Sequence, residues 1–345
     1  MDDARPLHQR MLTLPNDLQE AIGAALGTVS PVRWMREAQA LSERYRGPRG
    51  AGQHFASSPA EVLGYAAMIL PASYAQLRGA MASTAARVPE WTPRTLLDLG
   101  SGPGTALWAA VAQWPALSTL VAWERERAFI TLGRQLAQHS ESAAIRAARW
   151  EQADLQKLDH APAQTYDLVV LGHVLNELGE AERAAIVERA WAMTAGVLLI
   201  VEPGTAAAFS VVRAARDRLL LAEAHTLAPC AHDQPCPLQN DWCHFPQRLK
   251  RTAFQRRARE APSEWEDSKY SYAAMARFPT SHPIWGRVIR EPTSNKAYAE
   301  TLISSREGVA THRALKRNKA DFRAMRDLHW GDALDEPPAG DTVTR

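Results

Sequence analysis

Cysteine is scarce in this chain of 345 residues, and long apolar runs are absent from its sequence. The three cysteines, Cys230, Cys236 and Cys243, fall within 14 consecutive positions. Such an odd, clustered set argues against a disulfide framework and favours metal binding or buried free thiols. No stretch approaches the roughly 18 apolar residues of a membrane span, and the acidic opening does not resemble a targeting peptide. We therefore expect a cytoplasmic protein without a membrane partner.

The net charge is only +2, but the charges are unevenly distributed. Residues 246–330 contain 18 Lys and Arg against 9 Asp and Glu, whereas the rest of the chain contains 22 basic and 29 acidic residues. A local excess of this kind indicates where an anionic partner binds. The C-terminal part of the chain is therefore the expected interaction surface.

The first 90 residues have the apolar spacing of helices. This spacing marks residues 11–26, 32–45 and 59–85. The last of these segments begins with Ser58 and Glu61 in the positions of a capping box, with a proline at the first helical position. We therefore expect a helical N-terminal region.

From residue 95 to residue 201, short apolar strands alternate with helices, which is typical of right-handed crossovers. This pattern predicts the α/β class, with a doubly wound and mostly parallel sheet. We expect four units: a helical N-terminal region (1–90), an α/β domain (91–225), an extension (226–334) and a disordered tail (335–345). The extension contains the cysteine loop, a basic helix at 246–260 and some strands.

The turn after the first predicted strand carries the first candidate binding residues. Asp98 ends this strand, and Gly100 and Gly102 let the backbone turn tightly against a ligand. Gly104 opens a helix whose free amide groups favour a negatively charged ligand group. The first and third glycines are four residues apart, whereas the dinucleotide-binding fingerprint requires five. The turn therefore predicts a site for a carboxylate or a phosphate, with a dinucleotide disfavoured.

Acidic residues also end the next two predicted strands. Glu124 is placed to accept hydrogen bonds from two ribose hydroxyls, and Asp154 to accept one from an adenine amino group beside Leu155. Together with the glycine turn, these residues resemble the class I S-adenosylmethionine methyltransferases over residues 95–205. The resemblance implies S-adenosylmethionine as cofactor. The alternative is that these carboxylates cap helices in an unrelated doubly wound fold.

The fourth strand end, around His173 and Asn176, is where a methyl acceptor would lie. We count His173 among the candidate cofactor-binding residues, although a cap or a packing role fits it equally well. The Asn/Asp-Pro-Pro-aromatic motif of amino methyltransferases is missing, and no cysteine is placed for covalent base activation. The catalytic residues are therefore unknown, and methyl transfer itself is left open.

The cysteine loop is the candidate metal site. Thiolates of Cys230, Cys236 and Cys243 in a short, proline-rich loop can point at one centre, and soft sulfur selects zinc or an iron–sulfur cluster. The spacing is not that of a zinc-finger pair. Buried thiols without a metal are the alternative.

The loop and two later segments resemble a known family. The segments are 229–245, 265–272 with the sequence WEDSKYSY, and 330–332 with the sequence WGD, and the resemblance spans about residues 30–334. They are similar to the methyltransferase-like family of the mitochondrial small ribosomal subunit and its bacterial relatives. The resemblance implies binding to small-subunit ribosomal RNA during assembly, and a 4Fe-4S cluster held by four cysteines.

Three of the four cluster cysteines implied by this resemblance match Cys230, Cys236 and Cys243. Ser304 occupies the position of the fourth. This departure leaves three possibilities open: a cluster with another ligand at the fourth iron, zinc with His232 or His244, or no metal.

A run of basic side chains follows the loop. The candidate nucleic-acid-binding residues are Arg248, Lys250, Arg251, Arg256 and Arg257. Residues 246–259 contain no acid, so we expect about four helical turns of positive potential and RNA affinity that falls steeply with salt. A solvated helix is the alternative.

These observations predict a monomeric, S-adenosylmethionine-binding protein that acts on the small ribosomal subunit, or during its assembly, with methylation of ribosomal RNA as an open possibility. A catalytically inactive assembly factor that uses the fold as an RNA-binding scaffold is the first alternative. A small-molecule methyltransferase is the second.

Overall fold

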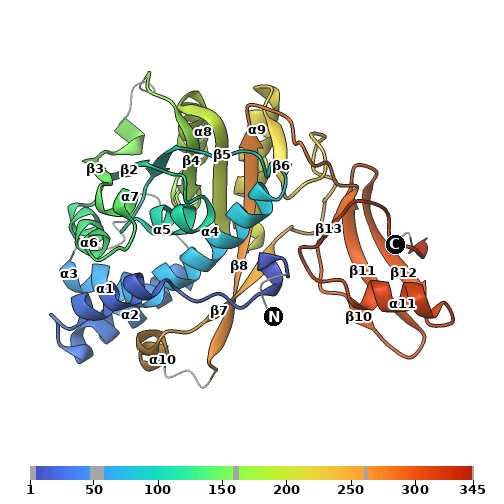
Figure 1. Cartoon of the computed structure of the whole chain (residues 1–345), viewed down its shortest axis with the longest axis horizontal. Coiled ribbons are helices and arrows are strands. Elements are labelled where there is room, and N and C mark those ends of the chain that lie inside the picture. Colours follow the sequence, from blue (N-terminus) through green and yellow to red (C-terminus); the bar gives the residue numbers. More distant parts are fainter. Residues whose placement is uncertain (1–4, 47–57, 158–162, 260–262, 344–345) are drawn as a thin grey trace.

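The computed structural model describes residues 5–46, 58–157, 163–259 and 263–343. Its main sheet has the strand order β3-β2-β1-β4-β5-β8-β6, and β7 pairs with β8 beyond this path (Figure 1). The strands are β1 (Thr95–Leu99), β2 (Thr119–Glu124), β3 (Arg149–Gln152), β4 (Tyr166–Gly172), β5 (Thr194–Pro203), β6 (His225–Ala228), β7 (Phe245–Lys250) and β8 (Trp265–Ala276).

The first five strands are parallel, and β8 is antiparallel to β5, β6 and β7. An antiparallel strand inserted next to the edge of a doubly wound sheet is the arrangement of the class I methyltransferase fold. The predicted fold class is therefore confirmed. The sheet extends beyond the boundary expected at residue 225, because β6, β7 and β8 all belong to it.

Helices cover both faces of the sheet, as its continuously apolar strands require. Alternate residues of β4 point to opposite faces, so Leu168 and Val170 join one apolar cluster, whereas Val169 and Leu171 join the other. Helices α4 (Leu70–Ala85), α5 (Thr105–Gln113) and α6 (Arg127–Gln138) contribute to the first cluster, and α8 (Glu180–Ala192) and α9 (Ala206–Leu221) to the second. The short α7 (Ala143–Arg146) precedes β3.

The N-terminal helices pack on the outside of the first cluster. They are α1 (Asn16–Leu26), α2 (Pro31–Arg46) and α3 (Pro59–Met68). The predicted capping box of α3 is present: Glu61 N–H donates to Ser58 Oγ at 3.2 Å, and Ser58 N–H donates to Glu61 Oε2 at 3.0 Å. The single helix expected over 59–85 is divided, because Pro71 suits the first turn of a new helix and cannot continue the old one.

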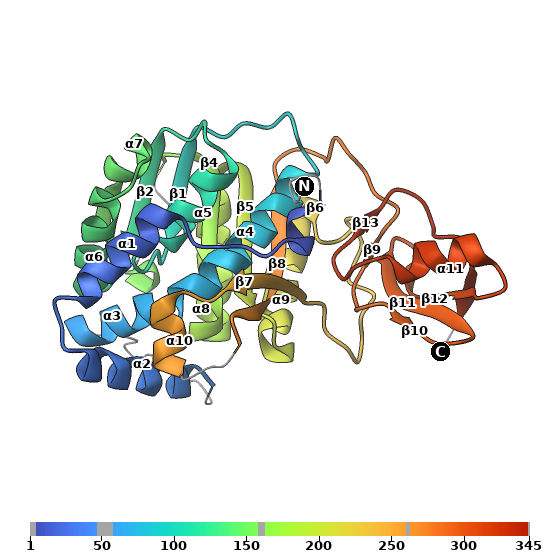
Figure 2. The ribbon, with the colours of Figure 1, turned by 60° about the horizontal axis from the view of Figure 1, so that its bottom comes forward.

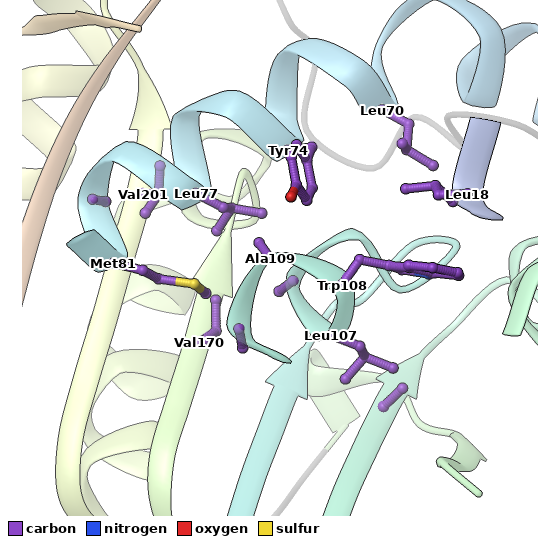
Figure 3. Packing of buried hydrophobic residues seen from close by; sticks show 14 of the residues in the cluster. Leu18, Leu70, Tyr74, Leu77, Met81, Leu107, Trp108, Ala109, Val170 and Val201 are labelled. Atoms are coloured by element: carbon purple, nitrogen blue, oxygen red, sulfur yellow. The ribbon is translucent and has the colours of Figure 1, made fainter. Parts of the chain in front are cut away.

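Helix α4 packs against α5 and the main sheet. Figure 3 shows Tyr74, Leu77 and Met81 of α4 facing α5 and the ends of β4 and β5, where Val170 and Val201 lie. All five side chains are buried. Burial of each stabilises the fold by about 1.5–3 kcal/mol, so α4 is an integral part of the α/β core.

A second, smaller sheet follows β8 and has the order β13-β9-β11-β12-β14, with β10 beside β11. Its strands are β9 (Gly286–Val288), β10 (Thr293–Ser294), β11 (Tyr298–Ser305), β12 (Gly308–Leu315), β13 (Ala333–Leu334) and β14 (Asp341–Val343). Helix α11 (Lys319–Arg326) lies over β11 and β12 (Figure 2), with Met325 buried against Ala299 and Ala314. The predicted β-containing extension is thus a separate antiparallel sheet.

Two local predictions are wrong. The basic segment is not one helix over 246–260, because residues 245–250 form β7 and only Ala253–Arg259 form a helix, α10. Residues 245–250 alternate strictly between buried and exposed side chains, which is the period of a half-buried strand. The tail is not wholly disordered either, because β14 pairs with β12.

Candidate functional site

An open cavity of about 120 Å³ lies at the carboxyl ends of β1, β2, β3 and β4. Ligands bind at this edge in open α/β sheets, because the strand order reverses between β1 and β4 and leaves a crevice there. Six of the eight predicted cofactor-binding residues line the cavity. They are Gly100, Gly102, Glu124, Asp154, Leu155 and His173. The chain therefore brings together residues that lie up to 73 positions apart in the sequence.

The glycine turn forms one wall and adopts backbone conformations that require glycine. Gly100 has φ +71°, and a Cβ atom on it would lie 2.6 Å from Val174 Cγ2. Gly102 has φ +54°, and the nearest atom to a Cβ built there is the Tyr65 hydroxyl, 4.0 Å away. Gly102 therefore faces open space that a ligand can enter and that a larger side chain would fill.

Glu124, at the end of β2, fixes the shape of this turn. Its Oε2 accepts a hydrogen bond from Gly102 N–H at 2.7 Å, and its Oε1 accepts one from Glu126 N–H at 2.9 Å. Burial raises the pKa of Glu124 more strongly than these hydrogen bonds lower it. Each carboxylate oxygen can accept a second hydrogen bond, so the pair can still receive a diol from the cavity side.

Asp98 and Gly104, the other two predicted residues, do not line the cavity. Asp98 is 2% exposed, and its Oδ2 has no hydrogen-bond partner in the described part of the chain. Burial, followed by the negative charge of Glu124, raises the pKa of Asp98 to about 8. Gly104 instead allows close packing, because a Cβ there would lie 2.7 Å from the Trp150 ring.

The remaining predicted residues come from loops after β3 and β4. Asp154 caps its own loop, accepting from Gln156 N–H at 3.1 Å, and its Oδ2 lies 3.5 Å from Lys157 Nζ. His173 has φ +64°, uncommon for a residue with a side chain, and its N–H donates to the Val201 carbonyl at 2.8 Å. This bond continues the β4–β5 pairing and sets His173 at the cavity rim.

Other residues that line the cavity were not predicted from the sequence, among them Tyr65, Phe129 and Glu177. Tyr65 of α3 and Phe129 of α6 meet edge to face, with ring centroids 5.0 Å apart, and Glu177 follows β4. Burial raises the pKa of Tyr65, so its hydroxyl stays protonated. Phe129 and Tyr65 give the cavity an apolar wall next to its polar turn, which suits a ligand with both an aromatic and a polar part. No local sequence signal places Tyr65 there, since α3 precedes the first strand by some 30 residues.

The cysteine loop forms a second, small cavity between α9, β8 and the smaller sheet. Cys230, Cys236, Cys243 and Ser304 all line it. The three thiols are half-buried, and no three His, Cys, Asp or Glu among the described residues are arranged to hold one metal ion. The predicted donors thus converge on one space, and His232 and His244 do not complete a mononuclear site with them.

Burial raises the pKa of Cys230 and of Cys243, and the neighbouring thiols raise that of Cys243 further. Arg216 opposes the shift at Cys230, and Arg290 opposes it at Cys243. The thiols of Cys230 and Cys243 are therefore neutral unless a bound cation displaces their protons.

The predicted RNA-binding cations are largely paired with acids on β8 and just before it. Arg248 Nε and Nη2 donate to Asp267 at 2.8 and 3.0 Å, and its guanidinium lies 3.9 Å from the Trp265 ring centroid. The other two pairs are Arg251 with Glu266 at 3.3 Å and Arg256 with Glu264 at 3.9 Å.

Lys250 and Arg257 are exposed and make no ion pair within the described residues. The segment itself contains no acid, but β8 brings acids next to it. The positive potential is therefore weaker than the sequence predicts.

Comparison with known proteins identifies the family. A sequence model described as "Mitochondrial small ribosomal subunit Rsm22" matches residues 59–335, which include both cavities. The chain belongs to the Rsm22 family. The recognised resemblance is thereby confirmed.

Two curated relatives illustrate the family. The human mitochondrial ribosome assembly protein METTL17 is 30% identical over 289 residues, which cover 78% of this chain and 61% of that protein. The Rsm22-cox11 tandem protein 2 of Schizosaccharomyces pombe, also mitochondrial, is 22% identical over 322 residues, or 79% of this chain and 43% of that protein. The Rsm22-family chain thus spans less than two thirds of either relative.

Solved structures similar to this one include two named methyltransferases. Magnesium protoporphyrin IX methyltransferase from Synechocystis PCC 6803, with S-adenosylmethionine bound, is 14% identical, with a TM-score of 0.39 over 69% of this chain and 91% of that chain. A putative RNA methyltransferase from Pyrococcus horikoshii is 11% identical, with a TM-score of 0.37 over 71% and 98%. Among the described residues, no helix is long and apolar enough to cross a membrane.

Proposed function

We propose that this Rsm22-family protein binds S-adenosylmethionine in the cavity at the β1–β4 edge and acts in assembly of the small ribosomal subunit. The observation that carries the cofactor assignment is the link between Glu124 and the glycine turn, beside a cavity into which Gly102 opens. The ribosomal assignment comes from the family, whose human member is named a ribosome assembly protein. Cytoplasmic location stays a prediction, since the named relatives are mitochondrial.

The residues present fit this cofactor in three respects. Glu124 has acceptor capacity left for the ribose diol, and Asp154 with Leu155 lies where an adenine would be bordered. Buried Asp98 Oδ2, unpartnered within the described residues, suits a cationic amino group, which would also lower its raised pKa. When bound, the cofactor supplies a methyl group on an activated sulfonium, so the protein mainly needs to orient an acceptor.

Ribosomal RNA is the proposed partner, and the exposed cations of the β7–α10 segment are the proposed contacts. Lys250 and Arg257 can neutralise phosphates directly, whereas Arg248, Arg251 and Arg256 must first leave carboxylates. Phosphate contacts fix position on RNA without reading its sequence.

We further propose that the cysteine cavity holds an iron–sulfur cluster rather than a single zinc ion. The donors surround one space without forming a set for one ion, which fits the wider spacing of ligands around a polynuclear cluster. Cys230, Cys236 and Cys243 would bind the cluster. Ser304 of β11, which occupies the position of the fourth cysteine, would be the candidate fourth ligand. Such a cluster would join the smaller sheet to the main one.

Purification without oxygen tests the cluster. Brown protein containing iron, with iron lost in a Cys243→Ser variant, is expected. Colourless, metal-free protein from iron-replete cells would contradict the cluster and leave the cofactor site unaffected.

A binding and transfer experiment tests the main proposal. Full-length protein is mixed with immature small subunits and radiolabelled S-adenosylmethionine, and binding and methyl incorporation into RNA are measured separately. Binding of both partners is expected. Incorporation would show an enzyme, binding without incorporation would favour the scaffold alternative, and failure to associate with the subunit would favour a small-molecule methyltransferase.

A further inference from the structure

A third cavity, of about 450 Å³, lies where the N-terminal segment, α4, β8 and the smaller sheet meet. It is distinct from the cofactor cavity and the cysteine cavity, with which it shares no cation. Its charged or titratable lining residues, apart from two tyrosines, are His8, Arg87, His282, Arg287, Asp332 and Asp335.

Two of these residues are buried arginines without a matching acid. Arg87 is 5% exposed and Arg287 is 4% exposed. Within the described residues, Arg87 Nε and Arg287 Nη2 have no hydrogen-bond partner, and neither guanidinium has a carboxylate within 4.0 Å. Burial, followed by the charge of Arg287, lowers the pKa of Arg87 to about 10, so the Arg87 side chain is still cationic at neutral pH.

The surrounding groups offset only part of this charge. The charge of Asp335 opposes the lowering of the Arg87 pKa, but Asp335 is exposed and makes no ion pair with Arg87 within the described residues. Asp332 accepts hydrogen bonds from His8 Nε2 at 2.7 Å and Gln9 Nε2 at 2.9 Å. The carboxyl end of α4, just before Arg87, supplies only about half a unit of negative charge. Buried charges are normally paired, so two unpaired guanidiniums facing one cavity require an anion from outside.

We propose that this cavity binds a phosphate group, with Arg87 and Arg287 as its ligands. Guanidiniums match phosphate oxygens in pairs of hydrogen bonds, and the anion supplies negative charge next to the two cations. Arg287 is already oriented, because its Nε and Nη1 donate to the carbonyls of Pro229 and Gly331 at 2.6 and 2.8 Å. If the proposed function holds, the phosphate belongs to the RNA; otherwise it is free phosphate or a nucleotide.

Thermal unfolding of the full chain in phosphate and in chloride, at equal ionic strength, tests the site. Phosphate at ten times its Kd is expected to raise the Tm of the wild type by about 2 °C. Arg87→Gln should abolish this rise, and Arg33→Gln, at an exposed arginine of α2, should keep it. An equal rise in the Arg87 variant, or none in the wild type, would overturn the proposal.

A second pair of variants tests the site without replacing Arg87, in case Arg87→Gln does not fold. Ala86 is exposed and lines the cavity, so Ala86→Glu supplies an internal anion, and Ala86→Gln is its neutral control. The Glu variant should lose the phosphate response and the Gln variant retain it; a response kept in both would count against the site.

RNA binding then identifies the source of the phosphate. Weaker RNA binding by Arg87→Gln, with competition by inorganic phosphate in the wild type, would assign it to RNA. Unchanged RNA binding with a lost phosphate response would assign it to free phosphate or a nucleotide. Failure of the cofactor or subunit experiments would leave the phosphate response as it is.

Discussion

Replacing Glu124 by Gln should weaken cofactor binding while leaving the protein folded. The glutamine side chain has nearly the same shape but only one acceptor oxygen, so it can satisfy either Gly102 N–H or Glu126 N–H. Loss of a hydrogen bond to a charged group costs about 1.5–3 kcal/mol. Removing a buried charge whose pKa is raised offsets part of this cost in the free protein.

The bound state has no such compensation, because the ribose diol needs both oxygens. A loss of about 1.5–3 kcal/mol corresponds to a Kd about 10- to 150-fold higher. Calorimetric titration with S-adenosylhomocysteine measures this change, and thermal unfolding checks the fold. Glu188→Gln, on the exposed face of α8, is the matched control and should leave both measurements unchanged. An unaltered Kd in folded Glu124→Gln would refute the ribose contact.

Three further predictions concern single groups. Gly102→Arg should abolish cofactor binding, since its side chain extends into the cavity, and should lower Tm, since φ +54° is strained for arginine; retained binding in the calorimeter by the folded variant would disprove the site. Burial raises the pKa of Asp98 from its ordinary value of 3.8 to about 8, so wild-type stability should fall as pH rises from 4 to 8, by up to about 1.4 kcal/mol per pH unit. Asp98→Asn should remove that slope in denaturant titrations at several pH values, and an unchanged slope would show that Asp98 titrates normally. The double variant Lys250→Gln with Arg257→Gln should lower the slope of log K for RNA binding against log salt concentration by about two. Arg248→Gln, which breaks an ion pair with Asp267, should lower this slope by less, and an equal effect per residue would contradict that pairing.

The parallel part of the fold could be predicted because each of its strands has a local pattern in the sequence. Each parallel strand is a short apolar run, and the glycine turn with Asp98 marks where the first one ends. The same logic placed Glu124 and Asp154 at one sheet edge. Strand ends of a parallel sheet meet in space, so residue order alone indicates the neighbourhood of the site.

The errors arise where contacts are remote in sequence. Residues 245–250 were expected to be helical, but pairing with β8 makes them a strand and sets Arg248 beside Asp267. Tyr65 enters the cavity only because α3 packs against α6. None of these contacts produces a periodic pattern in the sequence.

A structure of the protein with S-adenosylhomocysteine tests the central claim most directly. The account predicts the ribose hydroxyls on the Glu124 carboxylate, the adenine beside Asp154 and Leu155, and the amino acid part against the glycine turn. Ligand bound at another edge of the sheet, or a cavity without ligand at saturating concentration, would contradict it.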